Sequence, residues 1–395
     1  MNTRIISNHK NTLTRLSAVL LAVLLLLPAC ARQPQPARIE EITFQSGSFN
    51  LIGDLRLPAG TGPFPVVLFV HGSGDADRTL FGAYLPVMER MLRAGYAVFS
   101  WDKPGYGEST GQLGWRVYHQ LAQIVLDAIE VVKAHPDIDP GQIGLWGISQ
   151  GSYVMPLVLT MSQDVAFMIC VSCAGMSGHD NKGYQITTYA MFCEDVPDEN
   201  ADQRTVLFAD LDKARTYETY EEYLHYREVL DAFVDISPSR QKLLQALSEN
   251  GASGAVPEEA WQANDPEIEG WWNPVEVLEQ VRIPVLAIFG DKDSNLDPIQ
   301  GAYAWRKALQ QAGNLNFRVE ILPKADHMLG VSESSCINEQ MKTFDQVLQE
   351  QGYGSLDETL VLFQQEPGQH IPLSAWPYTP GYLDLIEEWL IGLQP

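Results

Sequence analysis

The chain has 395 residues, 45% of them hydrophobic, which is more than one minimal domain needs and suits one large α/β domain that carries an insertion. Its 50 acidic side chains outnumber the 26 basic ones and give a formal net charge of −24. A surface this acidic repels phosphate backbones and anionic lipid, so the charge argues against nucleic-acid binding.

Residues 1–30 predict an export signal. Three basic side chains, Arg4, Lys10 and Arg15, precede an apolar run from Leu16 to Leu27, which is the pattern of a signal peptide. The run is too short for a stable membrane-spanning helix, which takes about twenty residues.

Two cleavage sites remain open at the end of this signal. Residues 27–30 resemble a bacterial lipobox in which Cys30 becomes the lipidated first residue, although Pro28 departs from the usual small or aliphatic side chain. Residues 29–31 equally fit the A-x-A rule of ordinary signal peptidase. We expect the lipoprotein form, with residues 31–38 as a tether. Either form places the mature protein outside the cytoplasm.

The next part of the chain alternates apolar strands with amphipathic helices. Residues 41–45 and 51–57 predict an opening pair of strands. Residues 65–70 and 96–100 are continuous β-branched and aromatic runs, typical of strands buried on both faces of a parallel sheet. Apolar residues from 117 to 132 recur at helical spacing. This alternation predicts a mostly parallel, doubly wound sheet that binds ligands at the carboxyl ends of its strands.

A G-x-S-x-G pentapeptide at 147–151 is the first candidate for chemistry. By itself it is a weak signal, because glycine and serine are both common. However, an apolar strand at 142–146 precedes it, and residues 152–159 after it can form a helix. A strand, a sharp turn and a helix describe a nucleophile elbow, so we expect Ser149 to be a nucleophile.

A long insertion follows the strand predicted at 166–172. Residues 176–278 are polar and rich in Tyr, Glu and Asp, and the α/β alternation resumes only at 283–289. We therefore expect an α/β core from 39–175 and 279–395, with a helical cap inserted between two sheet strands. The alternative is a helical decoration that does not contact substrate.

A serine nucleophile needs a base, usually a histidine that a carboxylate holds in one tautomer. In this topology the partners follow the serine in the order Asp, then His, at the ends of later strands. The loop after the strand at 283–289 offers three candidates for the acid: Asp291, Asp293 and Asp297. Aspartates are also common in turns, so the loop alone does not choose among them.

Two histidines come after these acids. His327 directly follows a strand predicted at 317–322, whereas His370 has no strand before it. We therefore predict that His327 is the base and that His370 is a loop residue. The stretch from about 330 to 378 is expected to be irregular, and a helix at Tyr382–Leu393 closes the chain.

A tetrahedral intermediate also needs N–H donors placed in advance around its oxyanion. The backbone N–H of Gln150, next to the nucleophile at a helix start, is one expected donor. The loop after the strand at 65–70 supplies the other, with Ser73 as the first choice and Gly72 as the second. His71 is expected to brace this loop rather than act as a base.

The four cysteines after the signal do not have zinc-ligand spacing. Cys170 and Cys173 lie in an apolar, strand-like run, and no second pair follows them at metal-ligand spacing. Export permits a disulfide, and Cys193 with Cys336 is the favoured pair because both lie in polar connecting segments.

These motifs together resemble the α/β-hydrolase superfamily, particularly exported bacterial esterases related to dienelactone hydrolases and serine aminopeptidases. The resemblance runs from about residue 39 to His327 and includes the closing helix. It rests on H-G-S-G at 71–74, W-D-K-P-G-Y-G-E-S at 101–109, the elbow at 147–151, Gly290-x-x-Asp293 and His327.

The resemblance implies an α/β-hydrolase fold with a helical cap before the strand that carries the catalytic acid. It implies Asp293 as that acid, and it assigns Asp102 and Ser109 to a structural turn below the site. Together with the cysteine spacing, it leads us to expect neither a metal nor an organic cofactor.

The expected activity is hydrolysis of a small-molecule carboxylic ester through an acyl-enzyme on Ser149. The alternatives are a serine exopeptidase or acyl-aminoacyl peptidase acting on short peptides, and an inactive surface binding protein. The aromatic residues Trp261, Trp271 and Trp272 either line an apolar acyl pocket or form the core of the insertion. The cap is expected to decide the substrate.

Overall fold

The computed structural model describes residues 38–114, 117–194, 198–249, 254–263, 270–354, 358–359, 362 and 372–394. The predicted export signal with Cys30, almost all of the tether, and His370 lie outside these ranges. Within them, every helix is too short or too polar to cross a membrane.

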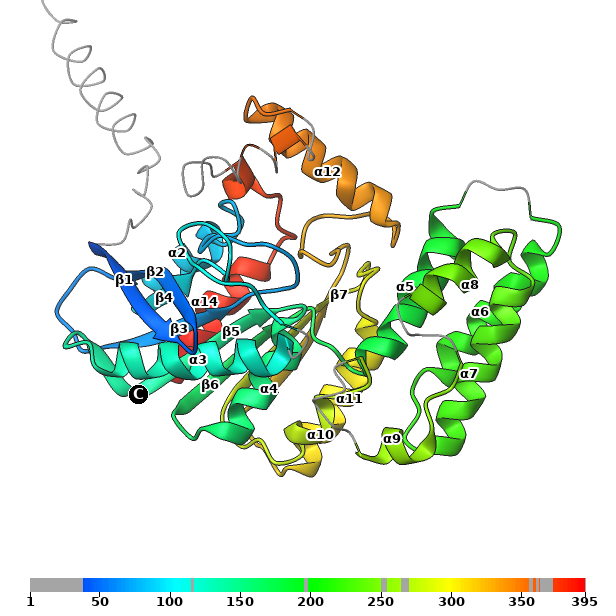
Figure 1. Ribbon diagram of the computed structural model, residues 1–395, viewed down its shortest axis with the longest axis horizontal. Coiled ribbons are helices and arrows are strands. Elements are labelled where there is room, and N and C mark those ends of the chain that lie inside the picture. Colours follow the sequence, from blue (N-terminus) through cyan, green and yellow to red (C-terminus); the bar gives the residue numbers. More distant parts are fainter. Residues whose placement is uncertain are drawn as a thin grey trace, which may run out of the picture. The chain divides into compact units, whose positions relative to one another are not determined.

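An eight-stranded sheet in the order β1-β2-β4-β3-β5-β6-β7-β8 forms the centre of the fold (Figure 1). The strands are β1 (Arg38–Ser46), β2 (Phe49–Leu57), β3 (Phe64–Val70), β4 (Ala97–Trp101), β5 (Ile138–Ile148), β6 (Val165–Val171), β7 (Val285–Gly290) and β8 (Phe317–Leu322). Strand β2 pairs antiparallel with β1 and β4, and all other neighbours are parallel. This confirms the predicted α/β fold with a mostly parallel sheet.

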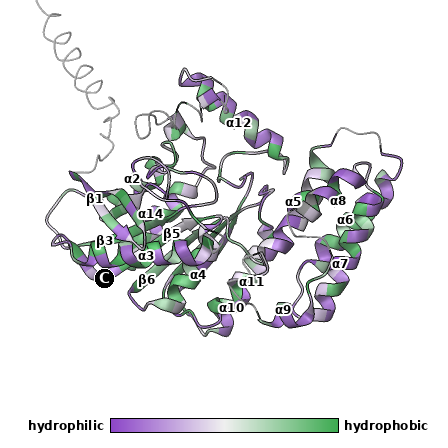
Figure 2. Cartoon of the chain, viewed as in Figure 1, coloured by the Kyte–Doolittle hydropathy of each residue, from purple (hydrophilic) through white to green (hydrophobic). Residues whose placement is uncertain are grey.

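The inner strands are buried on both faces, as their continuous apolar runs predict. Successive side chains point to opposite faces: Leu68 and Leu145 belong to one core cluster, whereas Phe69 and Trp146 belong to the other. Figure 2 shows hydrophobic residues concentrated in the sheet, and mixed polar and apolar residues along the helices that cover it.

Helices cover both faces of the sheet. The first core cluster includes side chains of α3 (Val117–Lys133), α4 (Gly151–Met161) and α11 (Pro298–Gln311). The second includes side chains of α2 (Leu85–Arg93) and the closing α14 (Tyr382–Leu393). The sheet is therefore wound on both sides, and the chain ends in the helix that the sequence predicts.

The insertion between β6 and β7 is helical and has a core of its own. It contains α5 (Gly178–Phe192), α6 (Ala201–Ala214), α7 (Tyr220–Asp235), α8 (Arg240–Glu249), α9 (Glu258–Ala263) and α10 (Val275–Leu278). A capping box between Thr219 and Glu222 starts α7. Tyr223, Leu230 and Phe233 of α7 are fully buried in this separate core of the cap.

The expectation of an irregular stretch from about 330 to 378 is wrong. The structure forms α12 (Ile337–Glu350) and the short 3-10 helix η1 (Pro372–Ala375) there. Most of α12 is polar, but Phe344, Val347 and Leu348 share one face of the helix. That face packs in a small cluster with side chains such as Leu373.

The structure forms two disulfides among the cysteines that it describes. Cys193 at the end of α5 is bonded to Cys336 just before α12, with their Cα atoms 5.1 Å apart, which confirms the predicted pair. Cys170 of β6 is bonded to Cys173, a bond that the sequence did not predict.

Candidate active site

Ser149 occupies the turn between β5 and α4 with a φ of 54°. Positive φ is strained for a residue with a side chain, and a nucleophile elbow requires it. A Cβ atom at Gly147 would lie 2.8 Å from Met155 Cε, and one at Gly151 would lie 2.5 Å from the Val70 carbonyl oxygen. The backbone contact requires glycine at 151, whereas a side chain at 147 would require Met155 to move, so the turn is crowded as the motif predicts.

His327 and Asp293 meet at the carboxyl ends of the last two strands. His327 Nδ1 lies 2.9 Å from Asp293 Oδ2 and 3.0 Å from Asp293 Oδ1. The carboxylate is fixed in turn, because Oδ1 accepts from the backbone N–H groups of Asn295 and Leu296 at 2.7 and 2.9 Å. The hydroxyl of Tyr184 on α5 donates to the Asp293 carbonyl at 2.6 Å, which ties the cap to the acid loop.

The other two aspartates of this loop have structural partners. Asp297 caps α11 by accepting from the N–H groups of Ile299 and Gln300, and it pairs with Arg215 at 2.9 Å. Asp291 accepts from the backbone N–H of Ala325 at 3.3 Å. Of the three candidates, Asp293 is the one that contacts His327.

Opposing influences set the pKa of His327. Burial lowers it, but the charge of Asp293, the hydrogen bond to Asp293 and the charge of Asp326 together raise the pKa above 6.5. Asp326 is itself buried, which raises the pKa of its carboxyl to about 7. Its Oδ1 accepts from the N–H groups of Met328 and Gly330, so it shapes the loop that carries His327.

Ser149 and His327 line the same cavity, which has a volume of about 400 Å³. Its walls are mainly apolar and include Leu80, Phe81, Leu296, Phe344, Leu348 and Leu373. Two of these side chains lie on α12 and one on η1, whereas the cap contributes Gln185 of α5. The segment that the sequence left irregular therefore supplies more of the apolar wall than the cap does.

The three candidate tryptophans are core residues. Trp272 packs in the main core, with its ring centroid 6.0 Å from that of Tyr118 and 6.5 Å from that of Tyr153. Trp261 and Trp271 pack in the core of the cap. None of the three is among the described residues that line the cavity, so the pocket role is wrong and the core role holds.

The two expected oxyanion donors adjoin the nucleophile. Gln150 immediately precedes α4, where the first N–H groups of a helix have no intrahelical partner. Ser73 and Gly72 line the cavity. A Cβ atom at Gly72 would lie 3.5 Å from Ser149 Cβ, so this loop runs directly against the nucleophile.

Lys103 is a functional candidate that the sequence analysis missed. Its buried Nζ donates to the carbonyl oxygens of Gly72 and Gly74 at 2.8 and 2.7 Å. A trans peptide unit holds its C=O and N–H in opposite directions, so the Ser73 N–H points away from Lys103. Burial lowers the pKa of Lys103 to about 8. A lysine two residues after the end of the fully buried strand β4 was the available signal.

His71 lies under the same loop. Its Nε2 lies 2.7 Å from the Trp101 carbonyl oxygen, and its ring stacks on Tyr84. Burial, with a smaller effect from the charge of Lys103, lowers the pKa of His71 to about 4. The ring is therefore neutral at physiological pH, which suits the bracing role expected for it.

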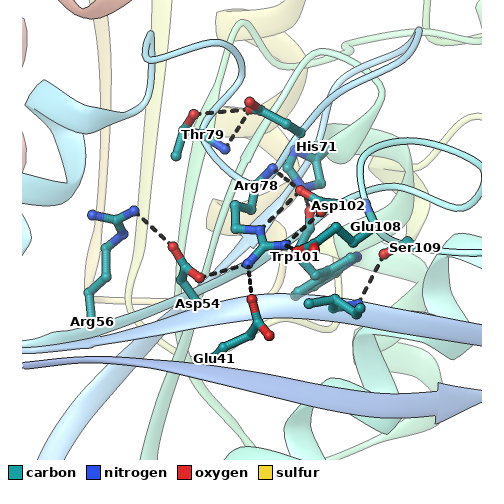
Figure 3. Close-up of polar contacts among 12 residues, drawn as sticks. Glu41, Asp54, Arg56, His71, Arg78, Thr79, Trp101, Asp102, Glu108 and Ser109 are labelled. Atoms are coloured by element: carbon teal, nitrogen blue, oxygen red, sulfur yellow. Dashed lines mark hydrogen bonds and ion pairs between the residues drawn. The ribbon is translucent and has the colours of Figure 1, made fainter. Parts of the chain in front are cut away.

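Asp102 lies in an ion-pair cluster around Arg78 (Figure 3) and is not among the described residues that line the cavity. The Arg78 guanidinium contacts both Asp102 oxygens, at 3.1 and 2.8 Å, and also pairs with Asp54 at 2.8 Å. Ser109 Oγ accepts from the backbone N–H of Ile52 at 3.0 Å. Both residues therefore hold the turn after β4 against β2, in line with the structural role that the resemblance implied.

In the described part of the chain, one group of side chains has the spacing of a metal site. Glu40, His135 and Asp137 lie close enough together to hold an ion. Arg38, however, pairs with both carboxylates, so its guanidinium already supplies the positive charge there.

Two family models match the chain. The model described as serine aminopeptidase, S33, matches residues 61–242, and the model of the prolyl oligopeptidase family matches residues 255–351. The first range includes the elbow and the second includes Asp293 and His327. The sheet order and the arrangement of serine, acid and histidine are those of an α/β-hydrolase fold.

Curated relatives match shorter segments. An uncharacterized 31.7 kDa protein of Escherichia coli is 29% identical over 111 residues, 28% of this chain and 38% of that protein. Esterase EstD of Thermotoga maritima is 26% identical over 118 residues, 29% of this chain and 28% of that protein. The 20-hydroxy-prefusarin hydrolase FUS2 of Gibberella moniliformis is 34% identical over 134 residues, 32% of this chain and 30% of that protein. The chain thus spans well under half the length of each of these relatives.

Among solved structures, an esterase of Pyrococcus furiosus matches with a TM-score of 0.46 and 15% identity. That match covers 74% of this chain and 82% of the esterase.

Proposed function

We propose that the protein is a serine hydrolase that cleaves carboxylic esters with an apolar acyl group, through an acyl-enzyme on Ser149. One observation carries the proposal: Ser149 and His327 line a single apolar cavity, and His327 is paired with Asp293. The reaction uses a nucleophile, an oriented base and a pocket that holds the apolar part of the substrate.

The proposed steps follow from the tautomer of His327. With the Nδ1 proton donated to Asp293, Nε2 is left as an acceptor that can take the proton of Ser149 during attack on the ester carbonyl. The N–H groups of Gln150 and Ser73 then stabilise the oxyanion. His327 returns the proton to the departing alcohol and next activates the water that releases the acid.

The character of the cavity favours an ester over an aminopeptidase substrate. A volume of about 400 Å³ falls in the usual range for small-molecule sites, roughly 300 to 1,000 Å³. The described lining residues include no Asp or Glu side chain that could hold the α-amino group of a peptide. The peptidase names of both family models keep cleavage of short peptides as the second candidate.

A fluorophosphonate probe and a substrate panel test the proposal. We expect the probe to label wild-type protein at Ser149 and to leave Ser149→Ala unlabelled. Wild-type protein should hydrolyse p-nitrophenyl esters of increasing acyl length faster than aminoacyl anilides. Absence of labelling in folded protein would refute any serine hydrolase, and faster turnover of the anilides would establish the peptidase instead.

We also propose that the protein is exported and anchored by a lipid on Cys30. The basic lead, the apolar run and the lipobox-like residues support this, as does the Cys193–Cys336 disulfide, a bond typical of oxidising compartments. A Cys30→Ser variant should move from the membrane fraction to the soluble exported fraction. Soluble wild-type protein that begins after Ala31 would show ordinary cleavage instead.

A further inference from the structure

A second cavity, of about 330 Å³, adjoins the first. Gln185 of α5 and Asn295 of the acid loop line both cavities, and the Gln185 amide donates to the Asn295 carbonyl at 3.1 Å. The outer walls include Lys182 on α5 and Lys242 on α8. A ligand in the first cavity therefore has a neighbouring space, with two lysines in its lining, into which its other end can extend.

The charge of this second cavity is opposite to that of the protein. Its described lining residues include no acidic side chain, although acidic residues outnumber basic ones 50 to 26. Lys182 Nζ lies 3.0 Å from the neutral amide oxygen of Gln185. Lys242 Nζ lies 3.4 Å from the Tyr189 hydroxyl and 4.8 Å from the centre of its ring.

Neither lysine is paired with a carboxylate among the described residues, whereas Lys133 and Lys307 are. Two lysines that line one cavity, without carboxylate partners in the described part of the chain, can hold an anion.

The position of the cavity indicates which part of a substrate reaches it. Ser294 and Asn295 line it, and they directly follow Asp293. In a serine hydrolase the histidine gives its proton to the leaving group, so the leaving group departs on the side of His327 and Asp293. The second cavity lies on that side of the nucleophile.

We propose that this second cavity binds an anionic group, a carboxylate or a phosphate, on the alcohol part of the ester. The first cavity then holds the apolar acyl part. The inference rests on the proposed ester hydrolysis and narrows its substrate class to esters that are apolar at one end and anionic at the other. The Cys193–Cys336 disulfide fixes the walls, because Cys336 lies between Ser335 and Ile337, which line the cavity.

A matched set of phenyl esters tests the inference on the full chain. The anionic substrates are 4-hexanoyloxybenzoate and 4-hexanoyloxyphenyl phosphate, and the neutral reference is 4-hexanoyloxybenzamide. The measured quantity is the ratio of kcat/KM for each anion to kcat/KM for the amide, so that differences in overall activity between variants cancel. The variants are Lys182→Gln, Lys242→Gln and their combination. Lys213→Gln, on α6 and outside the cavity, changes the net charge equally and is the control.

We expect wild-type protein to favour at least one anion, and the larger ratio identifies a carboxylate or a phosphate as the preferred group. Each lysine variant should lower that ratio about threefold and the double variant about tenfold, since each lost contact is a partly exposed charged hydrogen bond. Lys213→Gln should leave the ratio unchanged, and added salt should lower it only in proteins that keep the lysines.

A wild-type ratio without anion preference, or ratios that the double variant leaves unchanged, would overturn the inference while ester hydrolysis stands. An equal fall of the ratio in Lys213→Gln would also overturn the inference, because the net charge of the cap rather than the cavity would then explain the anion preference. If wild-type protein hydrolysed none of the three esters, the proposed ester hydrolysis itself would be refuted.

Discussion

The ionisation of His327 depends on its neighbours more than on its burial. Burial alone would lower its pKa, yet Asp293 and Asp326 raise it above 6.5. Because the pKa of His327 is higher in the folded protein than in the unfolded chain, its protonated ring stabilises the fold. This stabilisation is fully present below the unfolded pKa and is lost as pH rises through the folded pKa. Catalysis has the opposite requirement, because only the neutral ring accepts the proton of Ser149.

The first prediction concerns the acid side of the pH profile. We expect kcat/KM for a neutral ester to fall as pH drops through an apparent pKa above 6.5. In Asp293→Asn this limb should move to lower pH, and activity should fall by roughly 10³- to 10⁴-fold because the ring loses its tautomer. Asp326→Asn, whose parent carboxyl has a pKa of about 7, is the control and should move the limb slightly while most activity remains. A wild-type acid limb with an apparent pKa at or below 6.5 would contradict the raised pKa of His327.

The second prediction concerns Lys103, which acts through the backbone of the oxyanion loop. Lys103→Met should lower kcat about tenfold to a hundredfold with little change in KM, because a misplaced oxyanion donor costs transition-state stabilisation. Lys103→Arg should restore part of kcat. It should also abolish an alkaline limb near the lysine pKa of about 8, since a guanidinium stays charged. An unchanged kcat in Lys103→Met would exclude this positioning role.

At the scale of elements, α12 and η1 form an apolar wall of the catalytic cavity, and α5 contributes its polar edge. The strands and the elbow were predictable because a run of β-branched residues or a G-x-S-x-G turn carries its structure locally. The α12 segment has few apolar residues, and their main contacts lie with residues such as Phe81 and Leu373. A helical pattern is nevertheless present, since Ile337, Met341, Phe344 and Leu348 recur at helical spacing. The prediction of an irregular stretch overlooked that signal.

The third prediction tests that wall. Phe344→Ala should enlarge the cavity and shift the preferred p-nitrophenyl ester to a longer acyl chain. Trp272→Ala serves as the control: it should destabilise the fold by roughly 3 to 5 kcal/mol as a buried core truncation and leave the chain-length preference unchanged. The two effects are separated by comparing kcat/KM across the ester series with urea unfolding. If the preferred acyl length changed in Trp272→Ala but not in Phe344→Ala, the acyl pocket would be lined by Trp272 rather than by α12.

For the molecule as a whole, Arg78 joins segments that are far apart in sequence. It pairs with Glu41 of β1, Asp54 of β2, and Asp102 and Glu108 after β4 (Figure 3). The network thereby anchors the antiparallel edge of the sheet to the turn that carries Lys103. Removal of the guanidinium would leave the buried carboxylate of Asp102 without its charge partner.

The fourth prediction compares this network with a surface ion pair. Arg78→Met should lower the free energy of unfolding by roughly 3 kcal/mol, and Asp102→Asn in the same chain should recover part of that loss. Arg38→Met removes a pair in which the arginine side chain is 52% exposed, and it should cost much less because solvent screens an exposed ion pair. Urea unfolding measures all of these variants. Equal costs for Arg78→Met and Arg38→Met would show that the network is no stronger than a surface pair.

The sequence by itself determined the strand and helix alternation, the elbow around Ser149 and the chain order of nucleophile, acid and base. These features are encoded locally, in periodicity and turn chemistry. Only the tertiary structure showed that Asp293 rather than Asp291 or Asp297 contacts His327, a choice that the sequence made through family resemblance. The tertiary structure also decided that α12 forms a wall of the catalytic cavity and that Lys103 holds the oxyanion loop. It placed Lys182 and Lys242 in the lining of the second cavity, which adjoins the first. These contacts join segments distant along the chain, and no local pattern of residues specifies them.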